Sequence, residues 1–209
     1  MSLTAVVVAC ASGTTSKATP STSPAQLQAR LLTASDVGTG WQVGPPINGE
    51  DLSSVGQSIP CSDVPMDPAV TKRPTAVTGV QFEPTDHSSK HLIELLITGD
   101  AKQLVADMQT LTGAMDFCST KTMTTMENAK LTVKKLTLPK VGDQQAAYTV
   151  TDTADSTGTF YVRNAIARVG SVAVAIGLTE IMATPQSTPE INNDTFATIL
   201  KTGVNKFSH

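Results

Sequence analysis

The chain has 209 residues, of which 40% are hydrophobic and 16% are charged, and its net charge at pH 7 is −3. These values fit one globular domain of about 150–200 residues with a tail, and the absence of a Lys/Arg cluster argues against nucleic acid as a partner. No apolar run approaches the roughly 20 residues that a membrane-spanning helix needs.

The first ten residues end in Val7-Val8-Ala9-Cys10, where aliphatic and small residues precede a cysteine. This stretch resembles the bacterial lipobox, in which the cysteine is lipidated. We expect residues 1–10 to be the end of a signal peptide, with Met1–Leu3 left by an expression vector, because no basic region precedes the apolar stretch. The alternative is an ordinary cysteine at a frayed N-terminus.

Residues 11–24 are rich in Ser, Thr, Ala and Pro and hold little that could be buried. This composition predicts a flexible linker. Its position directly after Cys10 suits a tether that leaves a membrane. We therefore expect a lipid on Cys10 to hold the protein at the outer face of the cytoplasmic membrane, in the cell envelope.

The chain contains three cysteines, and an odd number requires that one be explained separately. If Cys10 carries the lipid, then Cys61 and Cys118 meet an oxidising compartment and are expected to form a disulfide. That bridge would close a loop of about 57 residues and contribute about 4 kcal/mol in the chain-entropy account. The alternatives are two free thiols in a cytosolic protein, or a zinc site, which would lack any CxxC spacing.

The folded part begins after Pro24 with a short helix, in which Leu27 and Leu31 lie on one face. The segment Ser35–Gly38 is expected to end this first unit. Six prolines in residues 44–75 exclude long regular elements there and place Cys61 in a loop.

Two strands are predicted next, at residues 77–85 and 90–100, and the second is apolar almost throughout, as a central strand would be. Asp100 is expected to cap the helix that follows. The apolar residues of this helix are spaced four, three, four and three apart and form one stripe. They are Leu104, Met108, Leu111, Met115 and Cys118.

The rest predicts strands at 129–138, 145–153, 158–169 and 171–178, followed by a helix at 194–207. The triplet Asn193-Asp194-Thr195 is interpreted as the start of that helix rather than as a glycosylation site. Short connections between successive strands indicate an antiparallel sheet. We predict one α+β domain over residues 25–207, with five to six strands and helices packed on one face of the sheet.

No sharp catalytic motif is present: the nucleophile elbow, the phosphate-binding loop and the dinucleotide fingerprint are all missing. His87 and His91 come closest to a metal pair, but their segment is predicted to be a turn and a strand rather than a helix. Asp152 and Asp155 are two carboxylates beside a glycine turn, where Asp is favoured for local hydrogen bonds. We therefore predict no catalytic residue, no metal site and no cofactor.

Several short landmarks, in order along the chain, are similar to those of the extracellular sensor domain family of the mycobacterial kinase PknH, which includes many lipoproteins. They are Leu31–Gly38, the Pro-rich stretch ending at Cys61-Ser62, the helix that delivers Cys118, the turn Leu138–Asp143 and the hairpin Arg168-Val169-Gly170. The resemblance implies an extracytoplasmic α+β domain with a cleft for a ligand. The resemblance implies two disulfides, as in the extracellular domain of that kinase, whereas this chain has cysteines for one beside Cys10.

Taken with the lipobox, the resemblance predicts a non-catalytic, membrane-anchored sensor-like lipoprotein that binds a small or lipidic envelope ligand. Because the chain has no kinase domain, any signal would need an envelope protein partner. Two alternatives stay open: a carrier of lipid or glycolipid, and an envelope enzyme. The family offers no sharp binding motif, so the sequence nominates no ligand-binding residue.

Overall fold

The computed structural model of the protein describes residues 23–45, 47, 76–119, 122–124, 130–154, 158–182 and 189–208. Cys10, residues 11–22 of the expected tether and Cys61 lie outside these ranges, as does Asp155, whereas Ser23 and Pro24 belong to the start of the first helix. The predictions that concern those residues remain predictions.

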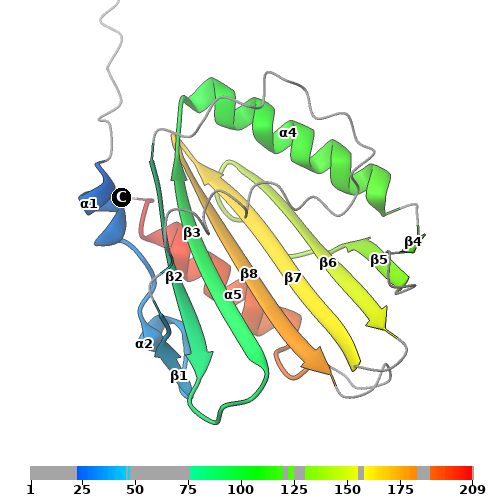
Figure 1. The fold of residues 1–209 in the computed structure, drawn as a ribbon. Coiled ribbons are helices and arrows are strands. Elements are labelled where there is room, and N and C mark those ends of the chain that lie inside the picture. The colour runs from blue at the N-terminus through cyan, green and yellow to red at the C-terminus, as the bar shows by residue number, and fades with distance from the viewer. Residues whose placement is uncertain are drawn as a thin grey trace, which may run out of the picture.

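One antiparallel sheet forms the centre of the molecule, and the prediction of an antiparallel α+β domain is confirmed (Figure 1). The described residues contribute eight strands in the order β1-β2-β3-β8-β7-β6-β5-β4. Their bounds are β1 Trp41–Val43, β2 Ala76–Pro84, β3 Lys90–Thr98, β4 Thr122–Thr124, β5 Lys130–Lys135, β6 Gln144–Ala154, β7 Gly158–Val169 and β8 Val172–Met182. The count exceeds the expected five to six because β1 and β4 are edge strands of three residues, too short to show a periodic pattern.

Helices cover both faces of the sheet, so the expectation of helices on one face was wrong. Figure 1 shows α4 (Ala101–Cys118) in front of the sheet and α5 (Asn193–Asn205) behind it. Residues of β6 contribute to the packing on both faces of the sheet, since successive side chains along a strand point to opposite faces. Val150 packs in the cluster beneath α4, whereas Ala147 packs in the main core beneath α5.

Both long helices begin as the sequence predicted. The side chain of Asp100 accepts hydrogen bonds from the backbone N–H groups of Lys102 and Gln103 at the start of α4. Asn192 caps α5 by accepting from the N–H of Thr195, so Asn193 is the first residue of a helix. Each cap satisfies backbone donors that have no partner inside the helix.

The single N-terminal helix expected after Pro24 is instead two short helices, α1 (Pro24–Gln28) and α2 (Ala34–Val37). Each has a capping box, Ser23 with Gln26 and Thr33 with Asp36, and the second box starts a new helix at the segment that was expected to end the first unit. Leu27, Leu32 and Val37 from this segment are buried in the main core.

The turn before β6 and the β7–β8 hairpin, two of the sequence landmarks, meet at one end of the sheet. Asp143 Oδ2 lies 3.2 Å from Arg168 Nη1 and accepts the N–H of Gly170 at 2.9 Å. Gly142 has a φ of +65°, and a Cβ at this position would lie 2.5 Å from the carbonyl oxygen of Arg168. Only glycine fits so close to the backbone of the neighbouring hairpin.

Replacing Gly142 with Ala is expected to lower the free energy of unfolding by about 2 kcal/mol or more, through backbone strain and the contact with Arg168. Gly170→Ala is the matched control, because Gly170 has a similar φ of +59° but a Cβ added there would meet no atom within 4 Å. The control should lose only about 1 kcal/mol. Urea unfolding of both variants measures the difference, and equal losses would show that the close approach at Gly142 is unimportant.

Candidate functional site

A buried glutamate lies at the junction between the N-terminal segment, the sheet and α5. Glu94 is in β3 between Val80 of β2 and Ile176 of β8, and its side chain is 0% exposed. Its Oε2 accepts the backbone N–H of Leu32 at 2.6 Å. Its Oε1 has no hydrogen-bond partner among the described residues. A Cβ added to Gly203 of α5 would lie 3.0 Å from that oxygen, so the glycine gives the carboxyl room beneath the helix.

The environment of Glu94 favours its neutral form. Burial raises its pKa from the ordinary value of 4.5 to about 7, because a charged carboxylate is poorly solvated there. The hydrogen bond from Leu32 and the charge of Lys206 oppose this shift, while the charge of Asp36 adds to it. The group therefore changes its charge near neutral pH.

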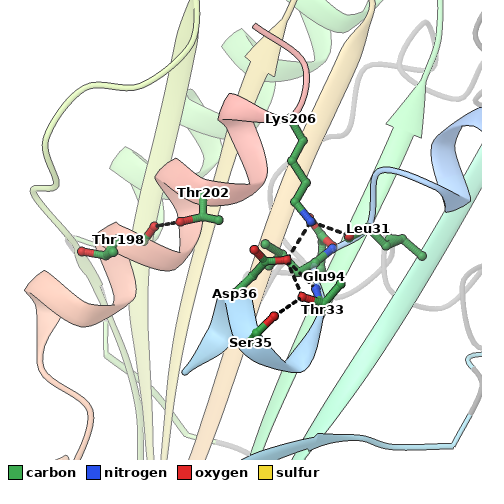
Figure 2. Close-up of polar contacts among 9 residues, drawn as sticks. Leu31, Thr33, Ser35, Asp36, Glu94, Thr198, Thr202 and Lys206 are labelled. Atoms are coloured by element: carbon green, nitrogen blue, oxygen red, sulfur yellow. Dashed lines mark hydrogen bonds and ion pairs between the residues drawn. The ribbon is translucent and has the colours of Figure 1, made fainter. Parts of the chain in front are cut away.

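Lys206, one residue beyond the end of α5, binds the N-terminal segment at two points (Figure 2). Its Nζ lies 2.7 Å from Asp36 Oδ2 and donates to the carbonyl oxygen of Leu31 at 2.7 Å. Thr33 donates to the same Asp36 oxygen through its N–H at 2.7 Å and its hydroxyl at 2.8 Å. Burial raises the pKa of Asp36, but the hydrogen bonds from Lys206 and Thr33 outweigh it and hold that pKa below its ordinary value.

We call this group the Glu94 cluster. Its members are Leu31, Leu32, Thr33, Asp36, Glu94, Gly203 and Lys206. Four of the seven belong to the landmark Leu31–Gly38, which fixes the chain against β3 and α5. Glu94 is not among the sequence-predicted site residues, because residues 90–100 predict an almost wholly apolar strand. The available signal was a single acidic residue inside an apolar run, HLIELLI.

A buried ion pair lies on the same face of the sheet as Glu94, and each of its two side chains has a further hydrogen-bond partner. Arg163 Nη1 and Glu180 Oε2 are 2.7 Å apart, and their side chains are 3% and 4% exposed. Arg163 Nε donates to Asn193 Oδ1, while Glu180 Oε1 accepts the N–H of Ile191, each at 3.1 Å. These contacts join the β7–β8 hairpin to the start of α5, so the pair is structural.

The opposite side of the sheet carries a groove between α4 and the β5–β6 end of the sheet. It consists of two open hollows of about 280 and 390 Å³ that share Thr112, Lys140 and Gln145. The hollow of 280 Å³ is also lined by Met115, Asp116, Lys135, Leu136, Thr137, Leu138, Ala146 and Ala147. The hollow of 390 Å³ is also lined by Met108, Gln109, Asp143 and Gln144.

The groove combines apolar side chains with polar groups of both charges. Lys135 and Asp116 form an exposed pair at 3.0 Å. Lys140 has no ion-pair partner within the part of the chain that the structure describes, and Gln145 Oε1 accepts the N–H of Val141 at 2.8 Å. Such a surface can bind a small molecule that has both apolar and polar groups.

Of the three cysteines predicted to carry the lipid or form the disulfide, Cys118 is the one that lies among the described residues. Cys118 is 0% exposed, at the end of α4, in the cluster beneath that helix. His87 lies in a turn with a φ of +56°, and His91 lies in β3, so the two do not share a helix face. Asp152 is half-buried in β6.

Within the described ranges, no three His, Cys, Asp or Glu side chains gather where they could hold a metal ion. Every helix in those ranges also falls short of the length and apolarity that crossing a membrane requires.

Comparison with known proteins places the fold. The chain matches no protein-family model and no curated protein. The crystal structure of the extracellular domain of PknH from Mycobacterium tuberculosis is 18% identical, with a TM-score of 0.58 over 86% of this chain and 93% of that one. An uncharacterized protein from Mycobacterium smegmatis, the Rv0999 ortholog, is 12% identical, with a TM-score of 0.37 over 88% of this chain and 94% of that one. The chain therefore has a fold similar to that of the PknH extracellular domain.

Proposed function

We propose that the protein is an extracytoplasmic, lipid-anchored, sensor-like domain that binds a ligand and catalyses no reaction. The fold is similar to that of a kinase's extracellular domain, which supports a location outside the cytoplasmic membrane. The lipobox-like stretch ending at Cys10 and the tether of residues 11–24 support a lipid anchor. We further propose that any signal passes through an envelope protein partner.

The groove beside α4 is the observation that carries ligand binding. Side chains from α4, from the end of β5 and from the start of β6 converge on it, and Thr112, Lys140 and Gln145 lie where its two hollows meet. Its lining fits a small ligand with an apolar part and polar substituents.

A lipid carrier would instead need a large apolar cavity between the sheet and its helices. Beneath α5, packed side chains of the described residues fill that space. Phe82 and Phe196 are 0% exposed, and Ile176 and Ile199 are 1% and 2% exposed. This packing favours the groove over an internal lipid cavity.

Native mass spectrometry of the protein purified from its own envelope tests the proposal. The wild type should carry an additional mass, and Thr112→Trp, which fills the groove where the two hollows meet, should lose it. Ala106→Trp is the matched control, because it adds the same side chain at an exposed position of the same helix. A wild type without bound ligand, or a Thr112→Trp variant that keeps it, would contradict ligand binding in the groove.

The cysteines give two further expected results. Peptide mapping without reduction should yield a linked peptide containing Cys61 and Cys118, because an exported domain meets an oxidising compartment. Expression of the full precursor in a lipidating host should yield a diacylglyceryl group on Cys10. Two free thiols would argue against export, and a secreted product without lipid would rule out the anchor.

A further inference from the structure

The Glu94 cluster lies where the chain enters the folded domain. Residues 23–37 stand at the start of the described chain, and the first two of them are the end of the predicted tether. They are attached to the domain through burial of Leu27, Leu32 and Val37 and through the polar contacts of the cluster. A change in those contacts would therefore alter how the tether joins the domain.

The polar contacts are concentrated on consecutive residues. The carbonyl of Leu31 accepts from Lys206, and the N–H of Leu32 donates to Glu94. Arg30 adds a contact from the other side, since its Nη1 donates to the carbonyl oxygen of Lys206 at 3.0 Å. Glu94 and Lys206 thus bind three successive residues of the N-terminal segment, residues 30–32.

The charges around Glu94 are unequal. The neighbouring strands present Val80 and Ile176, which carry no charge. The N-terminal segment contributes Asp36, and the end of α5 contributes Lys206. Two carboxyl groups therefore share one ammonium group. With Glu94 neutral, Lys206 and Asp36 form a balanced pair. With Glu94 ionised, the cluster holds a buried negative charge in excess, and Oε1 has no donor among the described residues.

We propose that the proton on Glu94 keeps residues 23–37 docked against the sheet, and that loss of this proton releases them. Release exposes the carboxylate to water, which removes the penalty of holding its charge in the core. The device is a pH-dependent joint between the tether and the domain. It goes beyond ligand binding in the groove and does not depend on it.

The size of the effect follows from proton linkage. The pKa of Glu94 is about 7 when the segment is docked and has the ordinary value of 4.5 when Glu94 is exposed. The opening equilibrium should therefore rise about 25-fold between pH 5.5 and pH 8, which is roughly 2 kcal/mol at 1.4 kcal/mol per factor of ten. Because Leu32 donates its N–H directly to Glu94, the amide of Leu32 reports this opening.

Amide hydrogen exchange followed by NMR, corrected for the intrinsic effect of pH, tests the proposal. The protection factor of Leu32 should fall about 25-fold from pH 5.5 to pH 8 in the wild type. It should stay nearly constant in Glu94→Gln, which keeps an acceptor for Leu32 but cannot ionise. Glu83→Gln makes the same change at a half-buried position on the neighbouring strand, outside the Glu94 cluster, and should behave as the wild type.

Asp36→Asn provides a second test if Glu94→Gln folds poorly. It leaves Lys206 with Glu94 as its only carboxylate in the cluster, so the loss of Leu32 protection should become smaller. A constant protection factor in the wild type, or an equal fall in Glu94→Gln, would overturn the proposal. The proposal would also be overturned if the protection factor of Ile176, in the centre of the sheet, fell by the same factor and to the same final value as that of Leu32. The opening would then be global unfolding.

Discussion

Replacing Arg163 with Met is expected to lower the free energy of unfolding by about 3–5 kcal/mol, because it leaves Glu180 buried without its partner. The two side chains are 3% and 4% exposed, and water cannot replace the guanidinium. Arg163 also donates to Asn193 at the start of α5, so its loss loosens the attachment of that helix. Urea unfolding at pH 7 measures the effect.

Two controls separate the buried charge from other effects of the substitution. The double variant Arg163→Met/Glu180→Leu should recover most of the lost stability, since apolar residues of similar size can replace a buried pair. Lys135→Met breaks the exposed pair with Asp116 and should change stability by less than about 1 kcal/mol. If Arg163→Met matched Lys135→Met, the buried pair would contribute no more than an exposed one.

The second large effect is a loss of stability as pH rises, and it comes from Glu94. Its folded pKa of about 7 lies above its ordinary value of 4.5, so stability is fully present below 4.5 and is lost as pH rises toward 7. We expect the wild type to lose about 2.5 kcal/mol between pH 5 and pH 8 from this group. Urea unfolding over a pH series should show this decline in the wild type and its absence in Glu94→Gln.

Asp36 acts in the opposite direction. Its pKa is held below the ordinary value of 3.8, so its contribution is present above that value and is lost as pH falls below it. Stability should therefore be greatest between the two transitions, near pH 4 to 5. Glu83→Gln should follow the wild-type curve throughout. A decline with pH that persists in Glu94→Gln would assign the effect to another group.

Much of the fold could be predicted from the sequence because periodicity and caps are local signals. The strand predicted at 158–169 coincides with β7, and Asp100 starts α4 as expected. These local signals could not say that helices cover both faces of the sheet, because that depends on the path of the chain between elements.

The buried charges were beyond sequence reasoning for a physical reason. β8 was expected to end at residue 178 but continues to Met182, because Arg163 from the adjacent strand neutralises Glu180. Glu94 was passed over inside an apolar strand because its surroundings come from the N-terminal segment and α5, both far away in the sequence. In each case the partner that makes burial tolerable is visible only in the folded chain.

The landmark Leu31–Gly38 could be recognised in the sequence, but its role could not. The structure shows that it presents the N–H of Leu32 to Glu94 and the carbonyl of Leu31 to Lys206, while Thr33 and Asp36 cap a short helix. These backbone contacts use groups that every residue carries. The side-chain pattern of the landmark therefore indicates a turn, but the contacts of its backbone with Glu94 and Lys206 are visible only in the structure.

Carbon-13 NMR titration of the Glu94 side-chain carboxyl tests most directly whether this buried group controls the joint. In the folded wild-type protein the carboxyl resonance should titrate with a midpoint of about pH 7, well above its ordinary value of 4.5. The signal can be assigned by its absence from Glu94→Gln. A midpoint near 4.5 would show that the carboxyl is ionised in the docked state at little cost, and would contradict the pH-dependent joint.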